Sequence, residues 1–363
     1  MKVLFASLNK VDNPFVFTLK KGIENLGCYV NWGLDEFWTN YLSYDIIHIN
    51  WPDALFESWS PTKIEVLFLE RIIKELKDKS KKIIYTRHNE RPHYSDNENV
   101  LRCYQIIEQN ADAIVHLGNY GVDELQKHLN CKHYIIPHHI YDTIYSNNIT
   151  KVEARNKLRI SQKKNVFLTF GAYRNKKEMD MILSAYKRLK IKNKCLLAPQ
   201  LYYSQLEIKR PTSLKSKRIW IKYIIQTIKS RIKQIVESKR YSIVGLKGFV
   251  SDDDLPLYFS ASDVILIQRN KILNSGNLPM AYYFKKMVVG PNVGNVGEII
   301  TKTKNLSFEP NNEDSLVYAL TTSTNIVKKE IEEHNYNYAI KFWNTDKIAR
   351  EYLDVYKSLL NWK

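Results

Sequence analysis

The chain has 363 residues, of which 44% are hydrophobic, and a formal net charge of +17 at pH 7. Its length allows two domains of ordinary size, and its composition is that of a folded protein, which excludes a disordered chain. So strong a positive charge favours an anionic partner, which means nucleic acid, an anionic membrane surface or a phosphorylated ligand.

Sequence motifs, or their absence, exclude some of these classes of partner. We find no aromatic-studded RNA motif, zinc-finger spacing or helix-turn-helix signature, so we expect no nucleic-acid partner. The apolar run in residues 1–10 is too short for a signal peptide, and no run of about 18 apolar residues occurs, so we expect a cytoplasmic location. The cysteines are far apart, which predicts reduced thiols without disulfide or metal. They are Cys28, Cys103, Cys131 and Cys195.

The first third of the chain alternates between apolar strands and amphipathic helices. We expect strands at 2–9, 44–51, 81–89, 111–118 and 133–141, and helices at 15–26, 64–76, 101–109 and 122–129. Alternation on this scale predicts a parallel sheet with helices on both faces. We therefore assign residues 1–150 to an amino-terminal Rossmann-like domain, followed by a polar linker from Lys151 to Asn165.

A second α/β series occupies residues 160–335 and opens with "NVFLTFGAYRNKKEMDMILSAY", a strand that leads into a helix. Gly171 falls at the turn between them, and Arg174 and Lys177 are about one helical turn apart. Two cations at this place are suited to hold a diphosphate. The alternative is that both are merely solvated at a helix start.

A basic insertion, residues 209–240, interrupts the second series, and Glu237 is its only acid. Its apolar residues recur at helical spacing and are Trp220, Ile221, Ile224, Ile225, Ile228, Ile232 and Ile235. The cations among and before them are Lys215, Lys217, Arg218, Lys222, Lys229, Arg231 and Lys233. This composition favours a helix in a membrane interface. The membrane contacts that we predict are Trp220, Lys222, Ile224, Ile228, Lys229 and Arg231. An amphipathic helix that covers the domain core, or a dimer contact, is the alternative.

The acidic run "SDDDL", residues 251–255, invites comparison with a metal-binding Asp-x-Asp motif. It precedes an apolar helix, however, and acids at that place are typical of an N-cap beside the positive end of the helix dipole. We predict a cap and no metal.

Residues 261–291 read as strand, turn, helix and strand, with the turn formed by Asn274, Ser275, Gly276 and Asn277. The first amides of a helix lack intrahelical partners and attract an anion, and the small turn residues leave the approach open. Together with the turn at Gly171, this predicts two half-sites for phosphate at the carboxyl ends of neighbouring strands.

The last segment, residues 336–363, reads as part of an amphipathic helix pair with aromatic residues on its apolar side. These are Trp343, Tyr352 and Tyr356. We expect this segment to cross back toward the amino-terminal domain.

With these motifs in place, the chain resembles the GT-B glycosyltransferases, and among them the group around glycosyltransferase family 4. Five stretches carry the resemblance over nearly the whole chain: "HNERPH", "IPHHIYDTIY", "FGAYRNKKEMDMILSAY", "GFVSDDDLPLYFSASDVILI" and "FWNTDKIAREYLDVY". The resemblance implies two Rossmann-like domains with parallel sheets facing a central cleft. It also implies a nucleotide-diphosphate sugar as donor substrate, no separate cofactor, and an acceptor held mainly by the amino-terminal half.

The resemblance also assigns the donor site. It implies that Gly171, Arg174 and Lys177 hold the donor diphosphate, and that residues 274–277 bind phosphate or sugar. One departure concerns the two glutamates that family 4 enzymes usually carry around this helix, because Ile272 and Met280 stand about where they would fall. Glu298 is a candidate replacement, and the stereochemistry of transfer stays open.

An inverting transfer needs a general base for the acceptor hydroxyl, and His, Asp or Glu can serve. Our candidates are His88, Glu90 and Asp53, each of which ends or follows a predicted strand. The alternative for each is that the side chain only orders the loop at the end of its strand. Several histidines also end or follow strands of the amino-terminal half, and we expect some of them to converge. They are His48, His88, His93, His116, His138 and His139.

We therefore predict a metal-independent glycosyltransferase of the hexosyltransferase type, peripheral on the inner face of the cell membrane. It would build a surface polysaccharide on a lipid-linked or glycan acceptor. Two alternatives stay open: a non-catalytic GT-B scaffold of a polysaccharide assembly machine, and a sugar-nucleotide epimerase. The epimerase is disfavoured because a soluble substrate gives the basic insertion no purpose.

Overall fold

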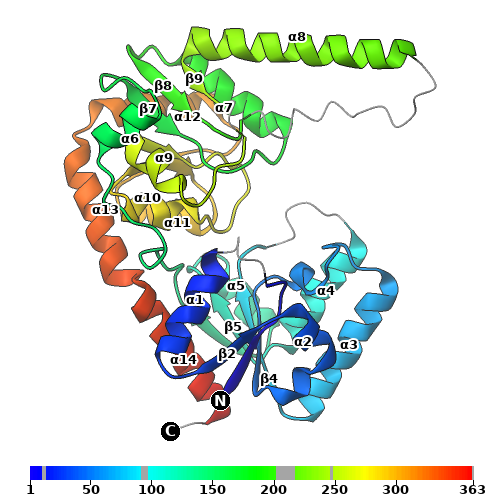
Figure 1. Ribbon diagram of the computed structural model, residues 1–363. Coiled ribbons are helices and arrows are strands. Elements are labelled where there is room, and N and C mark those ends of the chain that lie inside the picture. Colours follow the sequence, from blue (N-terminus) through cyan, green and yellow to red (C-terminus); the bar gives the residue numbers. More distant parts are fainter. Residues whose placement is uncertain (10–13, 91–96, 202–216, 246–247, 362–363) are drawn as a thin grey trace. The chain divides into compact units, whose positions relative to one another are not determined.

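The computed structural model describes residues 1–9, 14–90, 97–201, 217–245 and 248–361 (Figure 1). The chain divides into two compact units. Unit 1 comprises Met1–Ile144, Ile272–Pro279 and Tyr338–Lys363, and unit 2 comprises Tyr145–Lys271 and Met280–Asn337. Each unit contains a six-stranded sheet whose paired strands are all parallel. The predicted fold class, two α/β domains with parallel sheets, is confirmed.

The sheet of unit 1 has the strand order β2-β1-β3-β4-β5-β6. Its strands are β1 (Lys2–Phe5), β2 (Tyr29–Trp32), β3 (Ile46–Ile49), β4 (Lys82–Arg87), β5 (Ala113–His116) and β6 (Lys132–Ile135). All four residues of β3 are buried, as expected for a strand covered by helices on both faces. We had not predicted β2, because it is a four-residue edge strand in which only alternate residues are buried.

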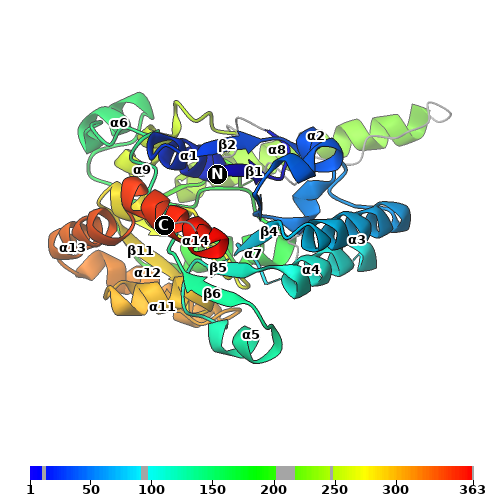
Figure 2. The same ribbon diagram turned by 90° about the horizontal axis from the view of Figure 1, so that it is seen from below.

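Helices cover both faces of this sheet. They are α1 (Pro14–Asn25), α2 (Leu34–Thr39), α3 (Lys63–Asp78), α4 (Glu98–Asn110), α5 (Val122–His128) and α14 (Thr345–Leu360), with short 3-10 helices at Tyr41–Ser43 and Pro52–Leu55. Apolar side chains of α1 and α14 form one buried cluster with the sheet, and those of α3 and α4 form another on the opposite face. The helix pair α1 and α14 lies side by side (Figure 2).

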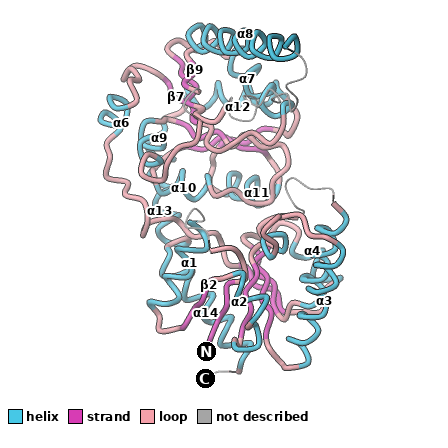
Figure 3. Tube along the Cα trace, turned by 45° about the vertical axis from the view of Figure 1, so that its right-hand side comes forward, coloured by secondary structure: helices cyan, strands magenta, loops and turns pink. Residues whose placement is uncertain are grey.

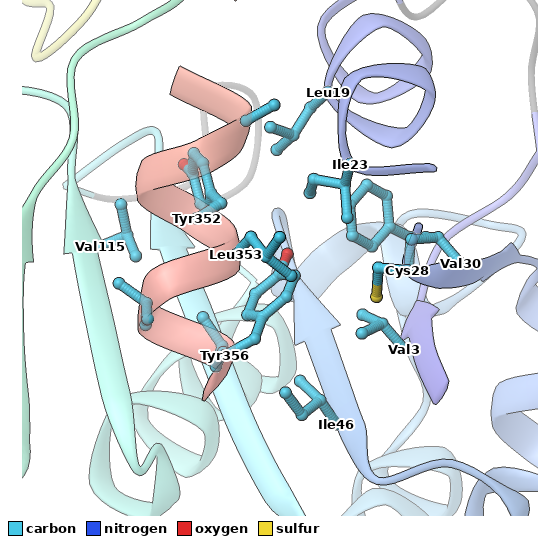
Figure 4. Close-up of a cluster of buried hydrophobic side chains, with 14 of the residues drawn as sticks. Val3, Leu19, Ile23, Cys28, Val30, Ile46, Val115, Tyr352, Leu353 and Tyr356 are labelled. Atoms are coloured by element: carbon cyan, nitrogen blue, oxygen red, sulfur yellow. The ribbon is translucent and has the colours of Figure 1, made fainter. Parts of the chain in front are cut away.

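The carboxyl-terminal helix α14 is an integral part of unit 1. Tyr352 and Tyr356 are fully buried and pack with Leu19 and Ile23 of α1 (Figure 4). The helix begins at Asn344, whose side chain accepts hydrogen bonds from two backbone amides of the first turn. Local capping therefore starts α14, and burial of its aromatic face holds it on the sheet.

The sheet of unit 2 has the strand order β12-β11-β10-β7-β8-β9. Its strands are β7 (Asn165–Leu168), β8 (Lys194–Leu197), β9 (Ile243–Val244), β10 (Val264–Leu266), β11 (Met287–Pro291) and β12 (Leu306–Phe308). The predicted central run of apolar residues forms β10, and all three of its residues are buried.

The helices of unit 2 are drawn with its strands in Figure 3. They are α6 (Lys151–Lys157), α7 (Lys176–Arg188), α8 (Lys217–Tyr241), α9 (Leu255–Ala261), α11 (Gly294–Lys302) and α12 (Glu313–Asn325), and the two units share α10 (Asn277–Tyr283) and α13 (Lys328–Phe342). A buried cluster joins α7 and α12 to the sheet.

The predicted linker from Lys151 is wrong. Thr150 and Glu153 form a reciprocal capping box that starts α6, and this helix packs against α9. Its Arg155 is buried and donates a hydrogen bond from Nη2 to Asp263 Oδ2 at 2.7 Å. The polar composition misled us because the charged side chains of α6 include one that is paired inside the domain.

The predicted cap at "SDDDL" is confirmed only in its position. Asp254 is the N-cap residue of α9, but its side chain makes no capping hydrogen bond. Asp252 instead accepts a hydrogen bond from the Tyr145 hydroxyl at 2.9 Å. The first acid of the run thus ties the start of unit 2 to the loop before α9.

Buried Lys286 gives unit 2 a testable pH dependence. Its Nζ donates to the carbonyl oxygen of Ser260 at 3.1 Å, and burial lowers its pKa to about 8. The native state then binds fewer protons than the unfolded state between pH 8 and 10.5, so stability rises with pH in this window and is lost as pH falls through 8. We expect the free energy of unfolding to increase by about 2 kcal/mol between pH 7.5 and 9.5 through this group.

Urea unfolding at the two pH values measures this effect. Lys286→Met should remove most of the increase, whereas Lys190→Met, at an exposed lysine of the same unit, should retain it. An equal increase in both variants would contradict the assignment to Lys286.

Candidate functional site

The loop that follows β7 in unit 2 is held by a buried carboxylate. Gly171 has a φ of +93°, a conformation that favours glycine, and Asn175 caps α7 by accepting from the Glu178 amide at 2.9 Å. Glu178 Oε2 accepts from the Arg174 amide at 2.9 Å and from Arg269 Nη1 at 2.7 Å. Arg174 therefore precedes the helix cap in a pinned loop and does not stand on the helix itself.

Three cations gather at the carboxyl ends of β7 and β10. Arg174 Nη1 donates to the carbonyl oxygen of Lys271 at 2.8 Å, and Arg269 Nη2 donates to that of Ala172 at 2.7 Å. The Lys177 side chain is exposed, with no hydrogen bond or ion pair to the described residues. Since Glu178 is the acid among them, the loop keeps a net positive charge suited to a phosphate.

Sequence reasoning missed Arg269. Its signal was available, because a cation two residues beyond the buried run at 264–267 lies at the carboxyl end of a parallel strand. Of the predicted donor residues in unit 2, Gly171 and Arg174 lie on the loop between β7 and α7, and Lys177 is the second residue of α7. Glu298 lies on another element, as an exposed residue of α11.

The Asn274–Asn277 turn belongs to unit 1 and not to the donor half in which we had placed it. Asn274 Nδ2 donates to the carbonyl oxygen of His88 at 2.9 Å, directly after β4. A Cβ at Gly276 would lie 3.2 Å from Tyr141 Oη and 3.8 Å from His138 Nε2. Glycine at this position thus permits close packing on those side chains, which is a different reason from the open approach that we predicted.

His88 is held rigidly at the end of β4. Its Nε2 lies 3.1 Å from Asn50 Oδ1, and its ring stacks on Trp51 with centroids 4.2 Å apart. The Phe15 ring meets it edge-on at 4.6 Å. The contacts with Asn50, Trp51 and Phe15 therefore fix the orientation of the His88 ring before any ligand binds.

Asp53 lies in the 3-10 helix that follows β3. Its Oδ1 accepts a hydrogen bond from the Tyr104 hydroxyl at 3.0 Å. Burial raises the pKa of Asp53, and the hydrogen bond from Tyr104 opposes the rise. The third candidate base, Glu90, is exposed. No hydrogen bond found in the described residues joins Asp53, His88 and Glu90 to one another.

The histidines divide between the two faces of the sheet in unit 1. His48 is fully buried between Tyr356 and Thr86, each 2.7 Å from one ring nitrogen, and burial lowers its pKa to about 3. His116 Nε2 lies 2.9 Å from His133 Nδ1 on the other face. His48 and His116 therefore do not belong to one group, because alternate strand residues point to opposite faces of the sheet.

Around Phe15, however, three predicted histidines do gather. The rings of His88, His138 and His139 lie 4.6 to 4.8 Å from the Phe15 ring. His139 is fully buried, with its nitrogens against the carbonyl oxygens of Ile140 and Phe15. His93 lies outside the described residues.

The helix α8 of the basic insertion has an unusual orientation. Its buried and half-buried side chains are polar or aromatic and are Trp220, Tyr223, Thr227, Ser230, Gln234, Glu237, Ser238 and Tyr241. Its apolar side chains instead form an exposed stripe, which we name the isoleucine stripe: Ile221, Ile224, Ile225, Ile228, Ile232, Ile235 and Val236. Each of these is 45% to 57% exposed. The alternative that the helix covers the core with its isoleucines is wrong.

Cations border the isoleucine stripe. Lys222, Lys229 and Lys233 recur at intervals of seven and four residues along one side of it, and all three are exposed. The opposite, polar side is tied to α7 by the ion pair between Glu237 Oε1 and Lys187 Nζ at 3.1 Å. Trp220 is half-buried and packs edge-on against Tyr223, so it lies beside the stripe and not within it. Residues 209–216 of the insertion are outside the described part.

The four cysteines are free thiols, of which Cys28, Cys103 and Cys195 are buried and Cys131 is half-buried. Within the described ranges, no three His, Cys, Asp or Glu side chains are grouped so that they could hold a metal ion. Among the helices described, none combines the length and the apolarity needed to cross a bilayer.

No protein-family model and no curated protein matches the chain. Solved structures are similar to it throughout. Sucrose-phosphate synthase from Thermosynechococcus elongatus has a TM-score of 0.72 at 13% identity, with 100% of both chains covered. The Anabaena protein HepE in complex with UDP-glucose has a TM-score of 0.69 at 12% identity, with 99% of this chain and 100% of that chain covered. A putative UDP-N-acetylglucosamine 2-epimerase from Listeria monocytogenes has a TM-score of 0.61 at 10% identity, with 100% and 97% covered.

The chain has the GT-B fold. The fold predicted from the resemblance is thereby confirmed. Because identities of 10% to 13% establish architecture alone, the chemistry of this GT-B protein has to be argued from its own residues.

Proposed function

We propose that this GT-B protein is a glycosyltransferase that moves a hexose from a nucleotide-diphosphate donor to a lipid-linked or glycan acceptor in surface-polysaccharide synthesis. The observation that carries the proposal is the pair of arginines at the carboxyl ends of β7 and β10, Arg174 and Arg269, with exposed Lys177 in the first turn of α7. A GT-B relative, HepE, is described in complex with UDP-glucose. A diphosphate on this loop would find the cations that its charge requires.

We also propose that Arg174 and Arg269 take the place of a metal ion at the donor diphosphate. A leaving nucleoside diphosphate gains negative charge as the sugar departs, and fixed guanidinium groups stabilise such charge. The Glu178 carboxylate holds the Arg269 guanidinium and the backbone amide of Arg174, and the carbonyl oxygen of Lys271 holds the Arg174 guanidinium. We therefore expect turnover without a metal ion or a separate cofactor, and unchanged activity in the presence of a chelator.

A thermal-shift screen with UDP, GDP and other nucleotide sugars tests donor binding directly. A ligand at 100 times its dissociation constant stabilises the protein by about 2.7 kcal/mol. Release of nucleotide diphosphate in the presence of glycan acceptors then tests transfer. A protein that binds no nucleotide sugar would contradict the proposal and favour a non-catalytic scaffold.

Arg174→Ala is expected to weaken nucleotide binding by about 1.5 to 3 kcal/mol, the range for hydrogen bonds to charged groups. The matched control is Lys176→Ala, since Lys176 is an exposed cation two residues away that we place outside the donor site. Isothermal titration with the nucleotide that stabilises best provides the measurement. Equal affinities in the two variants would remove the loop from the donor site.

The epimerase remains the second candidate, since a putative UDP-N-acetylglucosamine 2-epimerase shares the fold. The two candidates differ in product, because an epimerase converts one nucleotide sugar into another, whereas a transferase moves the sugar to an acceptor and releases the nucleotide diphosphate. The exposed isoleucine stripe favours the transferase, as a soluble sugar nucleotide would not require it.

We further propose that α8 docks on the anionic inner face of the cell membrane. The exposed aliphatic side chains of α8 would enter the apolar layer of the membrane, and the lysines beside them would meet the anionic headgroups. This docking would bring the transferase to a lipid-linked acceptor.

In the same proposal, Asp53 acts as the general base for the acceptor hydroxyl, because its raised pKa and its position in unit 1 suit that role better than exposed Glu90.

A further inference from the structure

The last residue of β4 is a buried arginine with two nitrogens that have no hydrogen-bond partner. Arg87 is 8% exposed, and its Nε and Nη1 atoms are buried without a hydrogen-bond partner. A guanidinium does not lose its proton in a protein, so burial cannot neutralise it as it neutralises a lysine or a histidine. Such a group is stable in the interior only when an anion or several acceptors meet it.

Arg155 in unit 2 shows how this chain otherwise buries an arginine. Arg155 is 1% exposed, and all three of its nitrogens donate. Its Nε bonds the carbonyl oxygen of Ala261 at 2.9 Å, and its Nη2 bonds the Asp263 carboxylate at 2.7 Å. Arg87 has donors of the same kind directed to no acceptor in the described residues, which indicates a site for a ligand.

The surroundings of Arg87 supply a second unpaired donor and no competing anion at contact distance. Tyr85 precedes it by two residues on the same strand, so both side chains lie on one face of the sheet, and Tyr85 Oη is also buried without a partner. His116 is the residue opposite Arg87 in the neighbouring strand. Burial and the Arg87 cation lower the pKa of His116 to about 3, which keeps this histidine neutral.

Among the described residues, Glu108 of α4 is an acid whose pKa is shifted by the charge of Arg87. Burial raises the pKa of Glu108, while the charge of Arg87 lowers it. No ion pair within 4.0 Å joins Glu108 to Arg87. Near the guanidinium, Gly121 has a φ of +72°, and a Cβ there would lie 3.8 Å from Arg87 Nη1. Gly121 and its backbone therefore lie beside Nη1 of Arg87, which has no hydrogen-bond partner.

We propose that Arg87 and Tyr85 form an oxyanion site that binds a phosphate group carried by the acceptor substrate. The inference rests on the proposed function only in naming the acceptor as the carrier. A phosphate meets a guanidinium in bidentate geometry along one edge, which for Arg87 is Nη1 with Nη2 or Nε with Nη2, and the Tyr85 hydroxyl would donate a further hydrogen bond. The charge of the phosphate then compensates the buried cation. The site lies in unit 1, as do Asp53 and His88.

Thermal unfolding with inorganic phosphate as the probe, compared with chloride at equal ionic strength, tests the site without any turnover. We expect phosphate to raise the melting temperature of the parent protein by about 3 °C or more at saturation. Arg87→Gln should lose that response. It should also melt no lower than the parent without phosphate, because it removes an uncompensated buried charge. Arg102→Gln is the matched control, as it removes an exposed arginine of unit 1 that pairs with Glu70.

A structural role for Arg87 makes the opposite prediction. If Glu108 or buried water compensates the guanidinium, then Arg87→Gln and Glu108→Gln should both lower the melting temperature in chloride, and the phosphate response should persist in Arg87→Gln. That result would overturn the proposal. Under the proposal, Glu108→Gln should instead bind phosphate more tightly than the parent.

Two further ligands in the same thermal-unfolding experiment test whether the phosphate is carried by a glycan or by a lipid. The Arg174→Ala variant distinguishes this site from the proposed donor site. Glucose 1-phosphate represents a phosphate on a glycan, and a short-chain phosphatidic acid below its micellar concentration represents one on a lipid. The carrier that stabilises the parent more than Arg87→Gln is the one that the site prefers, and no such difference for either carrier would overturn the assignment to the acceptor. Arg174→Ala should keep the Arg87-dependent response, so that failure of the donor site and failure of this site are distinguishable.

Discussion

Asp53→Asn is expected to lower kcat by about 100- to 10,000-fold while leaving nucleotide binding unchanged. This is the range that a positioned general base contributes to proton transfer. The asparagine keeps the size of the side chain and its hydrogen bond with Tyr104, but it cannot accept the proton of the acceptor hydroxyl. Initial rates at saturating donor and acceptor, together with titration of the nucleotide, measure the two quantities separately.

The pH dependence of kcat/KM provides an independent readout. Burial raises the pKa of Asp53, so the acid limb of the profile should lie above the usual range of a carboxyl group, and activity should fall as pH decreases through it. Tyr104→Phe removes the hydrogen bond that favours the charged form, so the limb should move to higher pH. If Asp53→Asn keeps its activity while His88→Gln loses it, the base is His88 and our assignment is wrong.

Reversing three lysines beside the isoleucine stripe is expected to weaken binding to anionic vesicles by about 100-fold or more. Each cation near an anionic surface contributes about 1 kcal/mol, so Lys222→Glu/Lys229→Glu/Lys233→Glu loses about 3 kcal/mol before repulsion is counted. The matched control is Lys157→Glu/Lys163→Glu/Lys190→Glu, which changes net charge equally at exposed lysines of unit 2 away from α8. Co-sedimentation with anionic and neutral vesicles at low and high salt measures binding.

The apolar half of the interface has its own variant. Ile225→Ser/Ile228→Ser/Ile232→Ser should bind weakly to both kinds of vesicle, because it removes buried aliphatic area while keeping the lysines. Activity on a short soluble acceptor should survive in all these variants. A parent protein that ignores anionic vesicles and forms dimers broken by the serine variant would show that the stripe is a protein interface, which contradicts membrane docking.

Local sequence predicted most of the buried strands and long helices of both units, but not the edge strand β2 or the helix α6. Continuous apolar runs such as 264–267 predicted buried parallel strands, since each residue of such a run faces a helix layer. The period of apolar residues predicted α3 within two residues and an amphipathic helix pair around α14, because burying one face of a helix requires that spacing. The Gly-containing turn after β7 was predicted for the same kind of reason, as its φ of +93° favours glycine.

The partners of these elements were decided only by the tertiary structure. Periodicity predicted that α8 is amphipathic, but whether isoleucines or polar residues face the domain depends on side chains of other elements, such as Lys187 of α7. The Asn274–Asn277 turn reads as a strand-to-helix connection, yet its hydrogen bond to His88 crosses 186 positions of sequence. The sequence alone does not distinguish the environments of Arg155 and Arg87. One is paired and the other is not, because compensation of a buried charge depends on groups that folding brings from distant segments.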